Sequence, residues 1–160
     1  MADPISILGT AGAVVGIVDL LAKTIRRVSE LRAQWKIVDA VVATFELQLI
    51  ALNTALTQIK EWTNTNTDDP HYQLSIDLDH CLSHCQLLVG IISTEIETLT
   101  AAEGDQSIAS KICFLFRTQG IAEVQKMIDH VTGALTLLLT ACNRFVVFPT
   151  LVLQHRMSHY

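Results

Sequence analysis

Apolar residues recur in steps of three and four along three long segments of this chain. The first segment carries Val38, Val42, Phe45, Leu49, Leu52, Leu56 and Ile59. The second carries Leu78, Cys81, Cys85, Leu88, Ile92, Ile96 and Leu99, and the third carries Ile121, Val124, Ile128, Val131, Leu135, Leu138 and Cys142. This spacing places each set on one face of an α-helix. Helices with matched apolar faces pack well as an up-and-down bundle.

Polar and helix-breaking residues separate these segments. The polar stretch Thr63–Pro70 predicts a loop, Gly104 and Asp105 break the second segment, and Pro149 is expected to end or interrupt the third. Half of the residues are hydrophobic, which is enough for a sizeable core in one domain. We therefore predict one all-α domain over 1–160, an up-and-down bundle of four to five helices. Its parts are an apolar N-terminal helix over about 4–22, a bundle over about 23–145 and a tail over 146–160.

The N-terminal segment Ile5–Ala22 is unusually apolar and rich in glycine. Asp3 and Pro4 suit the cap and the first position of a helix, and Asp19 is the one charged residue within the segment. At about 100° per residue, a narrow stripe collects Gly9, Gly12, Ala13 and Gly16, and the opposite side collects Ile7, Val14, Val15 and Val18. Glycine costs roughly 1 kcal/mol in a helix interior relative to alanine, so stability alone does not explain the stripe.

Two interpretations of this helix remain open. Small-residue stripes let helix backbones approach closely, especially in lipid, and a segment of this length just spans the hydrocarbon core of a bilayer. In that interpretation Asp19 is unfavourable, since its carboxylate must reach water or a partner. Alternatively, the helix lies in the middle of the bundle and its glycines make room for neighbouring helices. The membrane and the bundle interpretations are compatible if the helix is buried in the bundle at rest and leaves it on activation.

Charge is distributed unevenly along the chain. The net charge of -5 argues against nucleic acid as the main partner, because phosphate binding needs a basic face. Five basic residues nevertheless cluster directly after the apolar segment: Lys23, Arg26, Arg27, Arg32 and Lys36. Such a cluster can hold anionic lipid headgroups, at about 1 kcal/mol per cation near the surface, or it can be a solvated helix face.

Candidate chemical sites are few. His80 and His84 lie one helical turn apart, as do Cys81 and Cys85, and zinc accepts such ligands. The two cysteines also lie on the apolar seam, where a free thiol behaves as a small apolar residue, so the histidines are weak metal candidates. The chain has no phosphate loop, nucleophile elbow or zincin motif. We therefore expect neither an enzyme nor a cofactor. The N-terminus lacks the basic start of a secretion signal, which favours a cytoplasmic protein.

Two stretches resemble a known family. The opening Met-Ala-Asp-Pro-Ile-Ser-Ile, followed by small and aliphatic residues, is similar to the start of fungal HeLo-like domains. A second stretch resembles the same family. It consists of the aromatic and basic cluster Lys111–Arg117 and an expected helix that opens Gly120-Ile-Ala-Glu-Val-Gln-Lys-Met-Ile. The resemblance covers roughly residues 1–143. HeLo-like domains are the N-terminal domains of fungal NLR/STAND immune receptors. The resemblance therefore implies that the chain is either an excised domain of such a receptor or a stand-alone homologue.

The resemblance implies a cell-death execution domain that moves from the cytoplasm to the plasma membrane on activation. Its relatives are thought to expose the N-terminal helix, form homo-oligomers and permeabilise the membrane. Gly9, Gly12 and Gly16 match a glycine zipper with Ala13 on the same stripe, although the first spacing is three residues instead of four. The alternative is a docking or dimerisation module of a fungal signalling receptor, with no membrane role.

Overall fold

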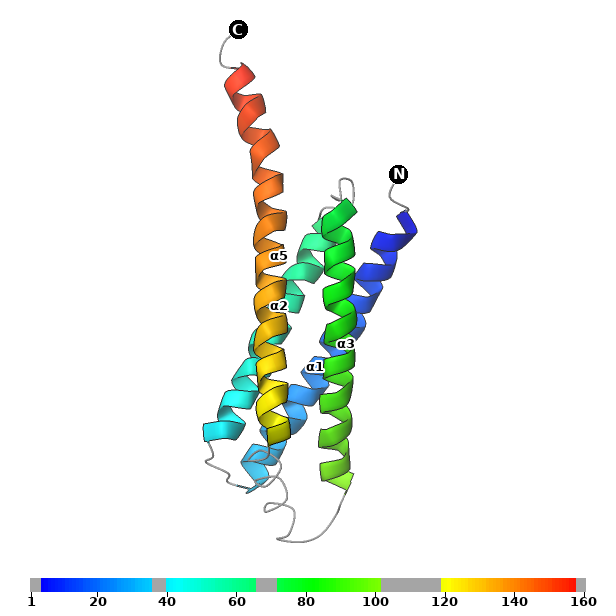
Figure 1. Ribbon diagram of the computed structural model, residues 1–160, viewed down its shortest axis with the longest axis vertical. Coiled ribbons are helices and arrows are strands. Elements are labelled where there is room, and N and C mark those ends of the chain that lie inside the picture. The colour runs from blue at the N-terminus through cyan, green and yellow to red at the C-terminus, as the bar shows by residue number, and fades with distance from the viewer. Residues whose placement is uncertain (1–3, 36–39, 66–71, 102–118, 158–160) are drawn as a thin grey trace.

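Four long helices make up the described part of the chain. The computed structural model describes the backbone of residues 4–35, 40–65, 72–101 and 119–157, and the side chains of 12–33, 40–65, 76–98 and 120–143. The helices are α1 (Pro4–Trp35), α2 (Ala40–Thr65), α3 (Tyr72–Ala101) and α5 (Gln119–Met157) (Figure 1). No strand occurs within these residues, so the all-α prediction is confirmed. The cluster Lys111–Arg117 lies outside the described residues.

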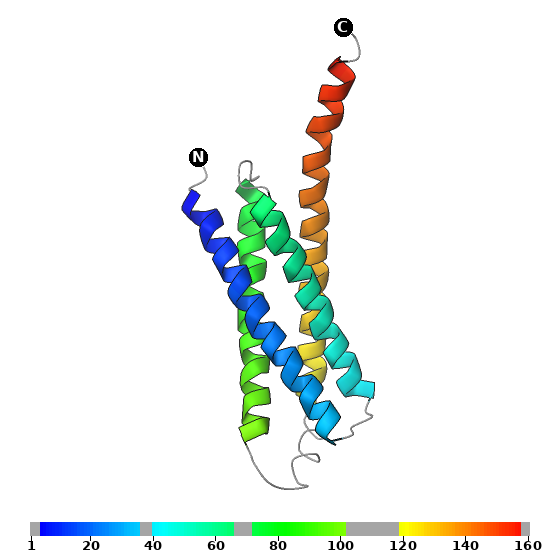
Figure 2. The same cartoon turned by 180° about the vertical axis from the view of Figure 1, so that it is seen from behind.

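Successive helices run in opposite directions, which makes an up-and-down bundle (Figure 2). The helix α1 packs against α2 and α3, and α5 packs against the same two helices from the other side. The helices α1 and α5 therefore lie across one diagonal of the bundle, and α2 and α3 lie across the other. The N-terminal end of α1 and the C-terminal end of α5 are at the same end of the molecule.

The apolar and the basic N-terminal segments form one continuous helix. Sequence patterning places the end of the apolar helix near residue 22, but α1 continues to Trp35. No helix-breaking residue lies between Ala22 and Trp35, and Val28 continues the buried face that begins at Val14. Lys23, Arg26, Arg27 and Arg32 thus lie on the same helix as the glycine-rich segment.

The predicted apolar seams form the core. In α2 every described member of the seam is buried: Val42, Phe45, Leu49, Leu52, Leu56 and Ile59. In α3 the buried members are Leu78, Cys85, Leu88, Ile92 and Ile96, and Cys81 is half-buried. Val38 and Leu99 lie outside the described side chains. The structure adds Leu82 and Val89 of α3, so the face by which this helix packs against α1 and α5 is wider than the predicted seam.

The helix α5 is seated more loosely than the others. Of its predicted seam, Ile128, Leu135 and Cys142 are buried, and the four other members are half-buried. Its contact with α2 is partly polar, since the Gln48 amide donates a hydrogen bond of 2.9 Å to the Asp129 carboxylate. The Gln48 Oε1 and Thr132 Oγ1 atoms are buried with no hydrogen-bond partner in the described part of the chain. Orphaned polar atoms of this kind cost about 1–3 kcal/mol each.

Pro149 does not end α5, contrary to the expectation from the sequence. The helix continues to Met157, so residues 146–157 extend α5 and do not form a separate tail. A proline inside a helix removes one backbone hydrogen bond and crowds the preceding turn, but a long helix retains its bonds on both sides.

Candidate functional site: the outward face of the first helix

The glycine stripe of α1 faces outward. Gly12 and Gly16 are exposed, and a Cβ atom added to either would meet no heavy atom within 4 Å. Asp19 and Lys23 are also exposed, and they continue the same line one and two turns further along the helix. Ala13 is half-buried at the edge of this line. We call Gly12, Gly16, Asp19 and Lys23 the outward stripe.

The opposite side of α1 belongs to the core. Val14, Ile17 and Leu21 are at most 3% exposed, and Val28 continues the same face. Thr24 is buried among them because its hydroxyl donates a hydrogen bond of 2.9 Å to the Leu20 carbonyl. The predicted position of Val14 is therefore confirmed, and Val18 is half-buried against the same core.

Two sequence-based expectations about α1 are corrected. Val15 lies with the glycines on the exposed side, not opposite them, because a residue three positions after Gly12 shares its face. The interpretation in which the glycines make room for neighbouring helices is wrong at Gly12 and Gly16, since no neighbour approaches either position. Ile7 and Gly9 lie on the helical backbone of α1, but the structure does not describe which way either position faces.

The basic cluster divides into two kinds of residue. Arg27 forms an ion pair with Glu97 of α3, and Arg32 forms one with Glu46 of α2 at 3.0 Å. These two pairs tie α1 to both of its neighbours. Lys23 and Arg26 are exposed and make no ion pair within the described side chains, and Lys36 lies outside them. Lys23 and Arg26 are therefore the members of the cluster best placed to meet an external anion.

The histidines and cysteines of α3 do not assemble into a reactive site. His80 and His84 are exposed, and the His84 Nδ1–H donates to the His80 carbonyl at 2.9 Å. Within the side chains that the structure describes, no three His, Cys, Asp or Glu residues are grouped to hold a metal ion. Burial raises the pKa of the Cys85 thiol to about 12, and burial followed by the charge of Asp77 raises the pKa of Cys81. Both thiols therefore stay protonated and weakly nucleophilic near neutral pH.

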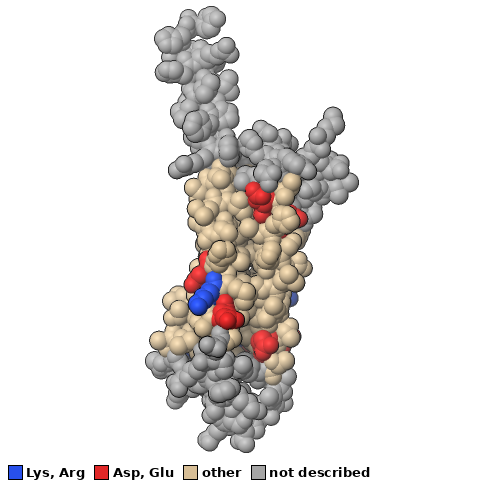
Figure 3. Space-filling view, viewed as in Figure 1, with Lys and Arg blue, Asp and Glu red and all other residues tan. Residues whose placement is uncertain are grey.

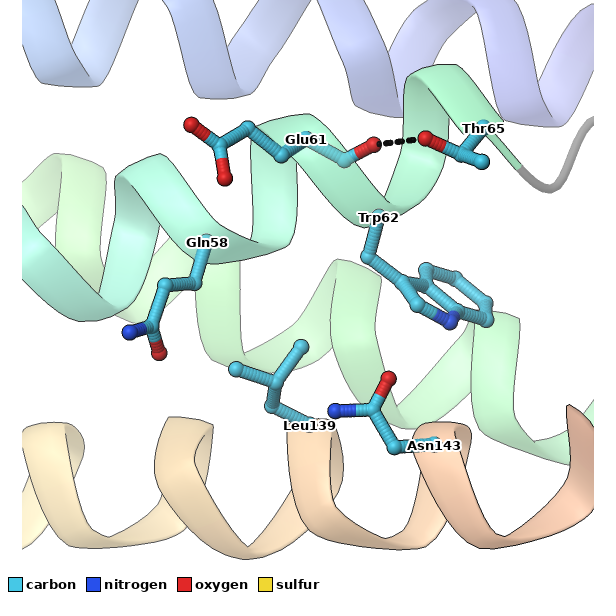
Figure 4. A pocket seen from close by; sticks show the side chains of 6 residues that line it. All are labelled: Gln58, Glu61, Trp62, Thr65, Leu139 and Asn143. Atoms are coloured by element: carbon cyan, nitrogen blue, oxygen red, sulfur yellow. Dashed lines mark hydrogen bonds between the residues drawn. The ribbon is translucent and has the colours of Figure 1, made fainter. Parts of the chain in front are cut away.

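A hollow of about 430 Å³ lies between α2 and α5 (Figure 4). Its lining residues are Gln58, Glu61, Trp62, Thr65, Leu139 and Asn143. The Trp62 indole and Leu139 make an apolar wall, the amides of Gln58 and Asn143 lie beside it, and the Glu61 carboxylate points away from α5. No single stretch of sequence predicts this hollow, because its two walls come from helices far apart in the chain. It holds no inward carboxylate or imidazole for acid–base chemistry.

Among the residues whose side chains the structure describes, one helix, α2, is long and apolar enough to cross a bilayer by length and composition. Packing within the bundle explains the apolar composition of α2 without a membrane, since its buried side chains form the centre of the core. No family model, curated protein or solved structure matches the chain.

Proposed function

We propose that this chain is a membrane-targeting effector domain that oligomerises through α1 and permeabilises the membrane, as the resemblance to fungal HeLo-like domains implies. The observation that supports the proposal most directly is the exposure of Gly12 and Gly16. Each costs the helix about 1 kcal/mol relative to alanine, and no contact within the bundle compensates for it. An outward glycine stripe is instead suited to close contact with a helix of another copy.

Asp19 fits this arrangement better than the sequence alone indicated. A carboxylate facing lipid is strongly unfavourable, but Asp19 lies on the outward stripe itself. When that stripe faces other copies of α1, Asp19 faces them as well, or faces water enclosed between them. The apolar residues Val14, Ile17 and Leu21 are then the ones that turn towards lipid when α1 leaves the core.

Lys23 and Arg26 provide a first contact with an anionic membrane. Both are exposed on α1 below the glycines and are free of ion pairs to the described residues. Each adds about 1 kcal/mol of attraction to a surface of anionic lipids, and this attraction is screened by salt. In this proposal the protein is cytoplasmic at rest, moves to the plasma membrane on activation, and receives its signal from an NLR/STAND receptor.

The test is co-sedimentation of the full chain with vesicles that contain phosphatidylserine, at low and high salt. We expect binding that weakens as salt rises, and a Lys23→Gln, Arg26→Gln variant that binds less at low salt. A matched Lys60→Gln, Lys126→Gln variant changes net charge equally on α2 and α5 and is expected to bind nearly as well as the wild type. Absence of binding by the wild-type chain at low salt would overturn the proposal.

A protein-docking module is the second candidate, and exposed apolar side chains favour it. Leu87 and Ile91 are more than half exposed on the outer side of α3, and Leu47 is equally exposed on α2. Apolar surface of this kind is typical of sites that a partner covers. This function predicts a stable oligomer or complex in solution, together with no affinity for vesicles of any composition.

A further inference from the structure

The helix α5 carries a long apolar stretch that the α1 proposal does not use. Residues 131–153 contain one charged residue, Arg144. As a helix they are about 35 Å long, which matches the hydrocarbon core of a bilayer at about 30 Å. Asp129 precedes the stretch, and Arg156 follows it. The part from Phe145 to Leu153 is apolar on all sides of the helix, with Thr150 its one polar residue.

The first part of this stretch packs one side against the bundle and exposes the other. Of the described side chains from Val131 to Asn143, Leu135 and Cys142 are buried, whereas Leu137 is 73% exposed. On the outer face formed by α3 and α5, charged side chains gather near the top and in the lower half and leave an uncharged band between them (Figure 3). Residues 80–94 of α3 and 130–143 of α5 contain no Asp, Glu, Lys or Arg. This face is therefore compatible with an apolar environment along much of its length.

The second part of the stretch projects from the bundle. The C-terminal part of α5, red in Figure 1, rises past the ends of the three other helices (Figures 1 and 2). It projects at the end where α1 begins. Two apolar helical segments from opposite ends of the sequence therefore lie at the same end of the molecule, on opposite sides of the bundle, where a single membrane surface can contact both.

We propose that residues 131–153 of α5 form a second bilayer-inserting segment, which enters the same membrane as α1. This inference rests on the proposed membrane function and adds a second inserting element to it. A lipid bilayer is favoured over a partner helix because residues 145–153 lack the polar face that a one-sided helix contact leaves exposed. Pro149 is tolerated in a spanning helix, and a single arginine such as Arg144 is compatible with a spanning segment.

The test places two carboxylates in the projecting segment of the full chain. Val147→Asp with Val152→Asp lowers partitioning into hydrocarbon by about 100-fold for each charge. The matched control, Thr44→Asp with Thr54→Asp, adds the same net charge at exposed positions of α2. Vesicles of phosphatidylcholine and phosphatidylserine, loaded with a self-quenching dye, report binding by co-sedimentation and permeabilisation by dye release.

We expect dye release by the Val147→Asp, Val152→Asp variant to fall more than tenfold, with vesicle binding through α1 within about twofold of the wild type. The α2 control is expected to release dye as the wild type does. Equal dye release by the wild type and the α5 variant overturns the inference, and so does an equal loss in the α2 control. If the α5 variant changes its oligomeric state in solution but releases dye as the wild type does, the segment contacts a second copy of the chain. That result also overturns the inference of bilayer insertion. A wild-type chain that does not bind vesicles instead overturns the proposed membrane function.

Discussion

Replacing the two outward glycines of α1 by alanine is expected to stabilise the folded protein. Neither Gly12 nor Gly16 has a heavy atom within 4 Å of the position that a Cβ would take, so the new methyl groups meet no steric resistance. Each substitution removes backbone freedom from the unfolded chain and improves helix propensity by about 0.4–1 kcal/mol. The Gly12→Ala, Gly16→Ala variant should therefore gain about 1–2 kcal/mol in free energy of unfolding.

Urea denaturation followed by circular dichroism measures this gain. With a dependence of about 2 kcal/mol per molar urea, the midpoint should rise by about 0.5–1 M. Gly133→Ala is a matched control on α5, where the glycine is also exposed and also has no heavy atom within 4 Å of a Cβ. It should gain about half as much as the double variant. A lower midpoint for the double variant beside a higher one for Gly133→Ala would refute the outward placement of the stripe.

Three further outcomes follow from the packing of the bundle. Leu21→Ala should lower the free energy of unfolding by about 3 kcal/mol in urea denaturation, because Leu21 is fully buried, whereas Leu47→Ala at an exposed position should change it by less than about 0.5 kcal/mol. Arg32→Met should lower the free energy of unfolding by about 1–2 kcal/mol, since it leaves the buried Glu46 carboxylate without its ion pair. Arg27→Met should lower it by less than about 1 kcal/mol, because both members of that pair are exposed. Equal effects of the two substitutions in thermal melts would contradict this ranking. Burial raises the pKa of Cys85 from 9.0 to about 12, so its contribution to stability is complete below pH 9 and is lost as pH rises towards 12. The melting temperature of the wild type should accordingly fall more steeply above pH 9 than that of Cys85→Ala, and parallel curves would show that the thiol does not contribute.

Helical periodicity predicted most of the core because each seam is a local property of one helix. The α2 seam is buried at every described position, from Val42 to Ile59. Periodicity alone does not predict Leu82 and Val89, because the width of a buried face depends on where the neighbouring helices lie around it. It misplaced the end of α5 because Pro149 is a strong local signal, and one lost hydrogen bond does not end a helix that continues on both sides.

The candidate site was only partly predictable. The sequence placed Gly12 and Gly16 on one side of a helix, but the direction of that side depends on where α2 and α3 lie around α1. The ion pairs of Arg27 and Arg32 were not predictable, because Glu97 is 70 positions away from Arg27 in the chain and Glu46 lies on another helix. The separation of the basic cluster into paired and unpaired residues therefore appears only in three dimensions.

In the proposed function, the outward stripe of α1 contacts other copies of the chain at a membrane. Dye release from phosphatidylserine-containing vesicles tests this contact directly, with the wild type compared with the double variant Gly12→Leu, Gly16→Leu. The control is Ala33→Leu, which adds a leucine at another exposed position of α1. We expect the glycine variant to stay folded in circular dichroism and to bind vesicles, but to lose more than about nine-tenths of the dye release because leucines prevent close helix approach. The Ala33→Leu control should retain it. Undiminished release by a folded Gly12→Leu, Gly16→Leu variant would contradict the claim.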